Sequence, residues 1–153
     1  MVFYAGQRLT AADLNYPLAL LRQTTLQALT SGAWTALTFT TEDIDSHNGH
    51  STVSNTDRYV VQRSGNYLIA GKTAYAANGT GQRGSRMTKN GVVVAGSQVL
   101  LERTGANNCM VPAATMLVPF VVNDIVRIEG IQTSGGSLNT SVSGNDEQSF
   151  LSL

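Results

Sequence analysis

From Ala33 onward the chain is a succession of short β-type runs separated by turn residues. Runs of this length, rich in Val, Ile, Thr and aromatic residues, are typical of an antiparallel sandwich or barrel. An all-β fold is therefore predicted for this part. The predicted strands are Thr35–Thr40, Arg58–Val61, Gly65–Ala76, Arg83–Lys89, Val92–Val94, Ser97–Glu102, Met110–Phe120, Ile125–Gln132 and Phe150–Leu153.

The strongest turn signal is the pair Asn90-Gly91, which lies between two of these runs. A type I′ turn needs positive φ at both central residues, and Asn-Gly meets that need best. The sequence therefore predicts a tight hairpin here. Weaker turn signals are Asn48-Gly49, Asn78-Gly79, Ser134-Gly135-Gly136 and Val121-Val122-Asn123-Asp124.

The N-terminal thirty residues have a different pattern, and their start resembles a helix N-terminus. Thr10-Ala11-Ala12-Asp13 has the spacing of a capping box, and Leu9 and Leu14 are placed as a hydrophobic staple. Pro17 removes a backbone donor and predicts a break, after which a second helical stretch can open. Whether the segment forms one helix or two stays open.

An apolar stripe continues beyond this start. Its members follow a 4-3-4-3 spacing, like two heptads of a weak coiled-coil seam: Leu14, Leu18, Leu21, Thr25 and Ala28. A helix this short is marginal alone, so the stripe needs either the body of its own domain or partner chains. The sequence thus predicts a helical arm over 1–32 and one β-sandwich domain over 33–153.

The bulk composition limits the function. A length of 153 residues suits one domain, and a net charge of zero with 13% charged residues excludes the basic surplus of a nucleic-acid-binding protein. The low charge and the many hydroxyl and amide side chains favour a crowded assembly of identical copies. The first thirty residues fit neither a signal peptide nor a membrane span, so no membrane association is expected.

Few residues suggest chemistry. His47 and His50 flank Asn48-Gly49 in an acidic, polar loop, but the spacing fits no calcium loop or zinc motif, so a solvated loop is the better interpretation. Cys109 is expected to be a small buried hydrophobe. No catalytic residue, metal site or cofactor is predicted, and the chain is not expected to be an enzyme.

Arg83 is the remaining candidate for a contact with a ligand. It lies on a predicted strand together with Arg86 and Lys89, where a solvated position is the simplest expectation. Contact with an anion or a glycan would need aromatic neighbours, which Tyr67 or Tyr75 could supply if the fold brings them near.

From Trp34 to the end, the order of these signals resembles the C1q/tumour-necrosis-factor-like jelly-roll family. The segments that carry the resemblance are Trp34–Phe39, Tyr59–Ile69 with Gly65-Asn66-Tyr67, Arg83–Gly91 with its Asn-Gly turn, Asn123–Ile128 and Phe150–Leu153. Asn66, where the family often has a hydrophobe, and Asn123, where it often has Gly, depart from the pattern. The resemblance implies a homotrimer, with Tyr67, Tyr75, Val126 and Phe150 in its core or its interface.

The N-terminal segment Tyr4–Asn15 carries a second resemblance. It is similar to a Gly-x-x-Leu-Thr-Ala-x-x-Leu-Asn opening found in structural proteins of tailed bacteriophages and prophages. In such proteins a short N-terminal segment attaches a trimeric domain to a capsid, tail or baseplate. The resemblance implies that residues of the arm dock to the virion: Leu9, Thr10, Asp13, Leu14, Leu18 and Leu21.

Together these features predict a non-enzymatic, trimeric phage surface protein, either a capsid decoration protein or a small head or tail spike. It would be made in the bacterial cytoplasm without a signal peptide and would bind a capsid or tail protein of the same virion. The alternative is a tail-fibre or baseplate head that recognises a host-surface glycan through the loops around His47–Ser54 and Ala76–Gly84, both at one end of the sandwich. A hydrolase is a third, weaker hypothesis, and host and receptor stay open.

Overall fold

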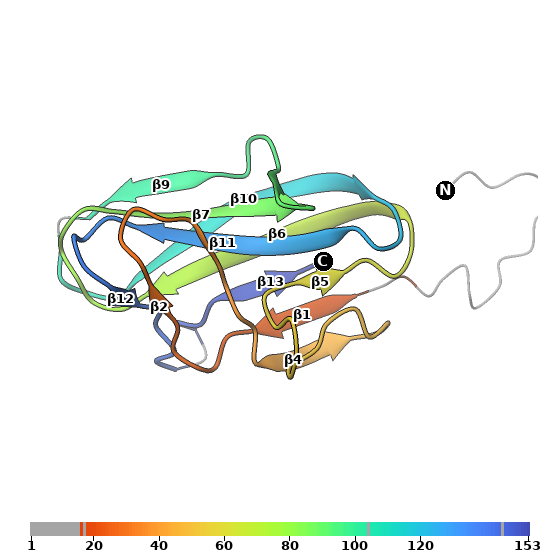
Figure 1. Cartoon of the computed structure of the whole chain (residues 1–153), viewed down its shortest axis with the longest axis horizontal. Helices are drawn as coiled ribbons and strands as arrows, with labels where there is room; N and C mark the ends of the chain where they lie inside the picture. Colours follow the sequence, from red (N-terminus) through yellow and green to blue (C-terminus); the bar gives the residue numbers. More distant parts are fainter. Residues whose placement is uncertain (1–15, 17, 104, 145) are drawn as a thin grey trace, which may run out of the picture.

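The computed structural model describes residues 16, 18–103, 105–144 and 146–153. All of the helices or strands assigned in this part are β-strands, and loops and turns connect them. Two antiparallel sheets face each other across an apolar core, and the longest strands run along the long axis of the molecule (Figure 1). None of the described residues forms a helix long and apolar enough to cross a membrane.

The first sheet has five strands in the order β10-β6-β13-β1-β4. Their bounds are Cys109–Phe120, Gly65–Tyr75, Phe150–Ser152, Ala19–Arg22 and Thr41–Asp45. Strands distant in sequence are therefore neighbours: β1 pairs with β13 in the register Leu21↔Leu151 and with β4 in the register Leu20↔Ile44. This sheet joins both ends of the described chain.

The second sheet has the order β3-β11-β7-β8, with β5 also paired to β11 and β9 to β7. These strands span Thr35–Ala36, Ile125–Gln132, Gln82–Lys89, Val92–Val93, Tyr59–Val60 and Val99–Glu102. A small third sheet joins β12 (Leu138–Asn139) to β2 (Ala28–Leu29).

The core lies between the two large sheets and follows from alternation along the strands. In β6, residues 67, 69, 71, 73 and 75 face inward, and in β11 residues 126, 128, 130 and 132 do so. Gly71 allows the closest approach, because a Cβ there would lie 2.4 Å from Cδ1 of Ile128. The two sheets are therefore packed backbone against side chain at this point.

The nine predicted strands are all present, and several are shorter than predicted. The Asn90-Gly91 hairpin is confirmed, with φ of +52° and +80° at the two residues. The turn before β11 is also confirmed, since the amide of Asp124 donates to the carbonyl of Val121 at 3.1 Å. Asn123, which stands where the family often has Gly, adopts φ of +73°.

The predicted helical arm over 1–32 is wrong for residues 18–32. Residues 19–22 form β1 inside the five-stranded sheet, and residues 28–29 form β2. Leu21 is fully buried, while Leu18 is 54% exposed, so these two residues do not share one helical stripe. Long-range pairing with β13 outweighs a weak local helix preference. The capping box and staple lie in residues 1–15, outside the described residues.

Candidate functional site

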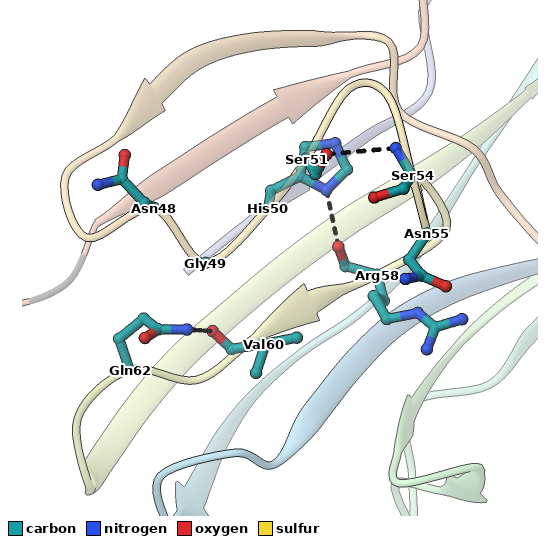
Figure 2. A pocket seen from close by; sticks show the side chains of 9 residues that line it. All are labelled: Asn48, Gly49, His50, Ser51, Ser54, Asn55, Arg58, Val60 and Gln62. Carbon is teal, nitrogen blue, oxygen red and sulfur yellow. Dashed lines mark hydrogen bonds between the residues drawn. The ribbon is translucent and has the colours of Figure 1, made fainter.

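A polar pocket of about 320 Å³ opens beside the loop between β4 and β5 (Figure 2). Most of its wall is amide, hydroxyl and backbone, with one guanidinium. Its lining residues are Asn48, Gly49, His50, Ser51, Ser54, Asn55, Arg58, Val60 and Gln62.

The carboxylate of Asp45 fixes the first wall of the pocket. It accepts hydrogen bonds from three loop amides: those of His47 at 3.3 Å, Gly49 at 3.1 Å and His50 at 2.8 Å. A carboxylate held by several backbone N–H groups ties a loop to one conformation and disperses its own charge. The backbone from residue 47 to residue 50 is thereby fixed next to the end of β4.

His50 connects this wall to the opposite strand. Its Nδ1 lies 2.7 Å from the carbonyl oxygen of Arg58, and its Nε2 lies 3.1 Å from that of Phe39. The ring also packs edge-on against the Phe39 ring. Three separate segments of the chain are thus held together by one side chain.

Gly49 completes the frame because no larger residue fits at its position. A Cβ there would lie 2.3 Å from the ring of Tyr59 and 2.6 Å from the carbonyl oxygen of Val60. The amide of Val60 in turn donates to the carbonyl of Gly49 at 2.7 Å. The pocket wall therefore rests directly on the aromatic core beneath it.

Arg58 brings positive charge to the pocket. Its Nε donates to Asp57 at 2.8 Å, and the same carboxylate accepts from Nε of Arg127 at 2.7 Å. Burial raises the pKa of Asp57, but the hydrogen bonds from Arg58 and Arg127 outweigh burial and the pKa is lowered. Two guanidinium groups share one carboxylate, so this trio carries one net positive charge.

A second surface is the outward face of the five-stranded sheet, away from the core. Leu68 of β6 and Leu117 of β10 are direct cross-strand partners here, and they are 65% and 68% exposed. This outward face, which we call the apolar face, also carries Leu20, Ile44, Ala70, Met110 and Phe150. An apolar pocket of about 320 Å³ at its edge is lined in part by Tyr16, Leu18, Leu68 and Leu153.

The residues predicted for core or interface can now be divided. Tyr67, Tyr75 and Val126 belong to the core, with exposures of 8%, 0% and 1%. Phe150 is half-buried and lies on the apolar face, where Lys72 sits 5.7 Å from the centre of its ring. Only Phe150 of this set is available to a partner chain.

The predicted ligand residues separate as well. His50 lines the polar pocket, whereas His47 neighbours it in the same loop and bonds Oγ of Ser46 through Nδ1 at 2.8 Å. The two candidate loops lie at opposite ends of β6, since residue 62 lines the pocket and the second loop follows Tyr75. An eleven-residue strand spans roughly 35 Å. The prediction that both loops build one site is therefore wrong.

Arg83 is fully buried, so the prediction of a ligand contact or a solvated position is wrong for this residue. Its Nη1 donates to the carbonyls of Thr80 at 2.9 Å and Gln82 at 2.8 Å, and its Nη2 donates to that of Asn78 at 3.2 Å. The guanidinium lies 5.8 Å from the centre of the Tyr75 ring. Burial lowers the pKa of Arg83. Arg83 thus anchors the loop after β6 from inside.

Of the predicted docking residues, Leu18 is exposed at the edge of the apolar face and Leu21 is in the core. Leu9, Thr10, Asp13 and Leu14 lie outside the described residues. Cys109 is buried as predicted, and its thiol is free. Within residues 16, 18–103, 105–144 and 146–153, no group of three or more His, Cys, Asp or Glu side chains is arranged to hold a metal.

Several residues of these two surfaces were missed in the sequence. Asn55, Arg58 and Gln62 come together only because the β4–β5 loop folds back on β5. Leu68 carried a usable signal: it stands in the unbroken apolar run Tyr67-Leu68-Ile69-Ala70, and such a run indicates a strand covered on both faces.

Solved structures with the same arrangement of strands are found at low sequence identity. The globular domain of the zebrafish complement 1qA protein aligns with a TM-score of 0.65 and 10% identity over 90% of this chain and 94% of that chain. Murine APRIL aligns with a TM-score of 0.64 and 11% identity over 90% and 98% of the two chains. The fold is a C1q/TNF-like jelly roll.

A third jelly roll of this type, Eiger TNF from S. frugiperda, aligns with a TM-score of 0.61 and 14% identity over 90% of this chain and 91% of that chain. No family model matches the sequence, and no curated protein matches it. The C1q/TNF-like jelly roll predicted from the order of strand signals is thereby confirmed as a fold, and function has to be argued from the surfaces of this chain.

Proposed function

We propose that the chain is a non-enzymatic subunit of a homotrimer that associates through the apolar face. The observation that carries this proposal is the exposed pair Leu68 and Leu117, which are 65% and 68% exposed on the paired strands β6 and β10 of the five-stranded sheet. Contiguous exposed apolar residues of this kind usually mark an interface. The resemblance to the C1q/TNF-like family, which implies a trimer, supports the same association.

The two sheets differ in a way that supports this choice of face. The outward face of the second sheet carries ion pairs, such as Arg86 with Glu129 at 2.7 Å, and Arg86 covers the Trp34 ring at 4.1 Å. Charged side chains already paired on their own sheet gain little from a partner chain. The apolar face gains more, because burial stabilises by roughly 25 cal/mol per Å² of apolar surface.

Light scattering on the purified chain tests the trimer. We expect a mass near three chains for the native protein, and a monomer for the double variant Leu68→Asp, Leu117→Asp. The matched control is Val92→Asp on β8, an exposed valine of the second sheet, which should remain trimeric. A monomeric native protein, or a double variant that stays trimeric, would exclude this interface.

We further propose that this trimer is a surface component of a tailed phage virion, as a capsid decoration protein or a small spike on head or tail. The segment Tyr4–Asn15, with its phage-type opening, supports the proposal, and its Leu9, Thr10, Asp13 and Leu14 are the proposed docking residues. Its partner would be a capsid or tail protein of the same virion. Three weak arms on one trimer would multiply each other's affinity through effective concentration.

The attachment test removes residues 1–15 and leaves Ala19–Arg22 intact, because β1 is part of the five-stranded sheet. We expect the truncated chain to stay trimeric and to lose its binding to phage particles that lack the protein. Unchanged binding to such particles would exclude docking through this segment.

A second candidate function is a tail-fibre or baseplate head that recognises a host-surface glycan. The polar pocket beside the β4–β5 loop is the specific observation that favours it. In this version the trimer would present three such pockets, and residues 1–15 would still carry the attachment.

A further inference from the structure

The polar pocket has a backbone held in one conformation, and several polar side-chain atoms of its lining make no hydrogen bond within the protein. Its walls are held by Asp45, by the His50 ring and by the contact of Gly49 with Tyr59. In the part of the chain that the structure describes, by contrast, the side chains of Asn48 and Asn55 make no hydrogen bond, and neither do the hydroxyl of Ser54 and Oε1 of Gln62. Polar groups held in place and left unused in a concave site are typical of a binding site.

These groups surround the pocket from both ends. Asn48 and Gln62 lie at one end in Figure 2, and Ser54, Asn55 and Arg58 lie at the other. Each amide side chain offers two donors and an acceptor, and the hydroxyl of Ser54 can do both. A ligand that fits them must carry several groups that both donate and accept, spread over its whole edge. Sugar hydroxyls have this property.

Arg58 adds a preference for negative charge. Its Nε is engaged by Asp57, but its Nη1 and Nη2 make no hydrogen bond within the described residues. Asp57 is shared with Arg127, and the charge of Asp45 is dispersed over three backbone amides. A guanidinium with two outer amines available binds a carboxylate in a bidentate manner.

We infer that the polar pocket binds one residue of an acidic saccharide at its Ser54–Asn55–Arg58 end, with the amide of Asn55 and the hydroxyl of Ser54 on ring hydroxyls and Arg58 on the sugar carboxylate. This inference deepens the glycan-binding candidate and rests on it. The lining contains no Phe, Tyr or Trp side chain to stack on a sugar ring, so hydrogen bonds must carry the affinity of a single pocket. We expect a dissociation constant on the order of 1–10 mM for one sugar. A polysaccharide that reaches all three pockets of a trimer would have a lower apparent dissociation constant through avidity.

The first experiment is a titration of the full ¹⁵N-labelled chain followed through its amide resonances, with sodium glucuronate, glucose and sodium acetate as probes. We expect saturable shifts at Gly49, His50 and Asn55 with glucuronate and at least about threefold weaker binding of glucose. Acetate alone should not saturate these resonances in the same range. Equal responses to acetate and glucuronate would show that the pocket binds simple anions and would overturn the saccharide assignment. The absence of any saturable shift would exclude a binding site here.

Two substitutions at Asn55 separate the contribution of its hydrogen bond from the contribution of charge. Asn55 has φ of +52°, a conformation that Gly and Asp tolerate, so Asn55→Gly and Asn55→Asp should both fold. We expect Asn55→Gly to weaken both sugars by roughly tenfold, the factor for one lost hydrogen bond. Asn55→Asp should weaken glucuronate more than glucose, because it places a carboxylate beside Arg58. Equal weakening of the two sugars by Asn55→Asp would overturn the carboxylate assignment.

The matched control is Asn107→Asp, an exposed asparagine away from the pocket, which should leave both affinities unchanged. The molar mass of each sample is also measured by light scattering. If glucuronate does not bind while the trimer persists, the saccharide site is wrong and the trimer stands. If glucuronate binds to a chain that is monomeric, the proposed assembly is wrong and the site stands.

Discussion

Among single residues, Asp124 shows how one side chain can join two turns. Its carboxylate accepts from the amide of Val121 at 2.8 Å, from Nδ2 of Asn90 at 2.6 Å and from Nζ of Lys89 at 2.9 Å. The Asn90 side chain also accepts from the amide of Ile125 at 2.7 Å. The Asn90-Gly91 hairpin and the β10–β11 turn are therefore held at one end of the sandwich by a single acidic group.

These contacts make the stability of the protein depend on pH. The hydrogen bond from Val121 and the contact with Lys89 lower the pKa of Asp124 from 3.8 to about 2. Because the folded-state pKa is depressed, the stabilisation is complete above about pH 4 and is lost as pH falls toward 2.

We expect Asp124→Asn to lower the free energy of unfolding by roughly 1–2 kcal/mol at pH 7, with the difference shrinking to near zero at about pH 2. Urea unfolding at a series of pH values measures it. Asp146→Asn, in an exposed loop, is the control and should change little at any pH. A difference that does not depend on pH would mean that the charge of Asp124 contributes nothing.

At the scale of elements, strand β1 is where local and long-range preferences compete. Leu18 and Leu21 would lie on one stripe of a helix, but in the strand Leu21 is fully buried and Leu18 is 54% exposed. We expect Leu21→Ala to destabilise the fold by about 2–5 kcal/mol, the usual range for a buried leucine. Leu18→Ala should change the stability of the monomeric double variant by less than about 0.5 kcal/mol. Thermal or urea unfolding of the two variants measures these effects. Equal destabilisation by Leu21→Ala and Leu18→Ala would support a helix over these residues instead of strand β1.

The approach of the two sheets makes a second prediction at this scale. A Cβ at Gly71 would lie 2.4 Å from Cδ1 of Ile128 and 2.9 Å from the carbonyl oxygen of Phe150. We expect Gly71→Ala to cost about 1–3 kcal/mol through overpacking. Adding Ile128→Val removes the Cδ1 methyl, so the double variant should be more stable than the sum of the two single effects predicts. If the two destabilisation energies from urea unfolding are strictly additive, the cost of Gly71→Ala does not come from contact with the Cδ1 methyl of Ile128.

At the scale of the whole molecule, the apolar face links folding to association. If the chain is a trimer through Leu68 and Leu117, its melting temperature must rise with protein concentration, because association stabilises only the folded state. We expect this dependence in the native protein and none in Leu68→Asp, Leu117→Asp. Calorimetry over a hundredfold range of concentration measures it, with Val92→Asp as the control that keeps the dependence.

Local preferences along the chain are sufficient to predict several parts of the fold. The runs that became β6, β7, β10 and β11 alternate or persist as apolar segments, and Asn90-Gly91 is the best local solution for a tight hairpin. The order of these signals along the chain was sufficient to predict the C1q/TNF-like jelly roll.

Features that depend on partners distant in the chain could be seen only in the folded molecule. β1 became a strand because Leu21 pairs with Leu151, 130 positions later, and no local pattern contains that contact. Arg83 looked solvent-facing in sequence, yet three carbonyl groups of its own loop enclose it. The polar pocket exists only because the β4–β5 loop returns to β5, which brings Asn55 beside Arg58 and leaves Asn48 at the opposite end. Such sites escape sequence reasoning, because the residues that build them are neighbours in space and follow no period along the chain.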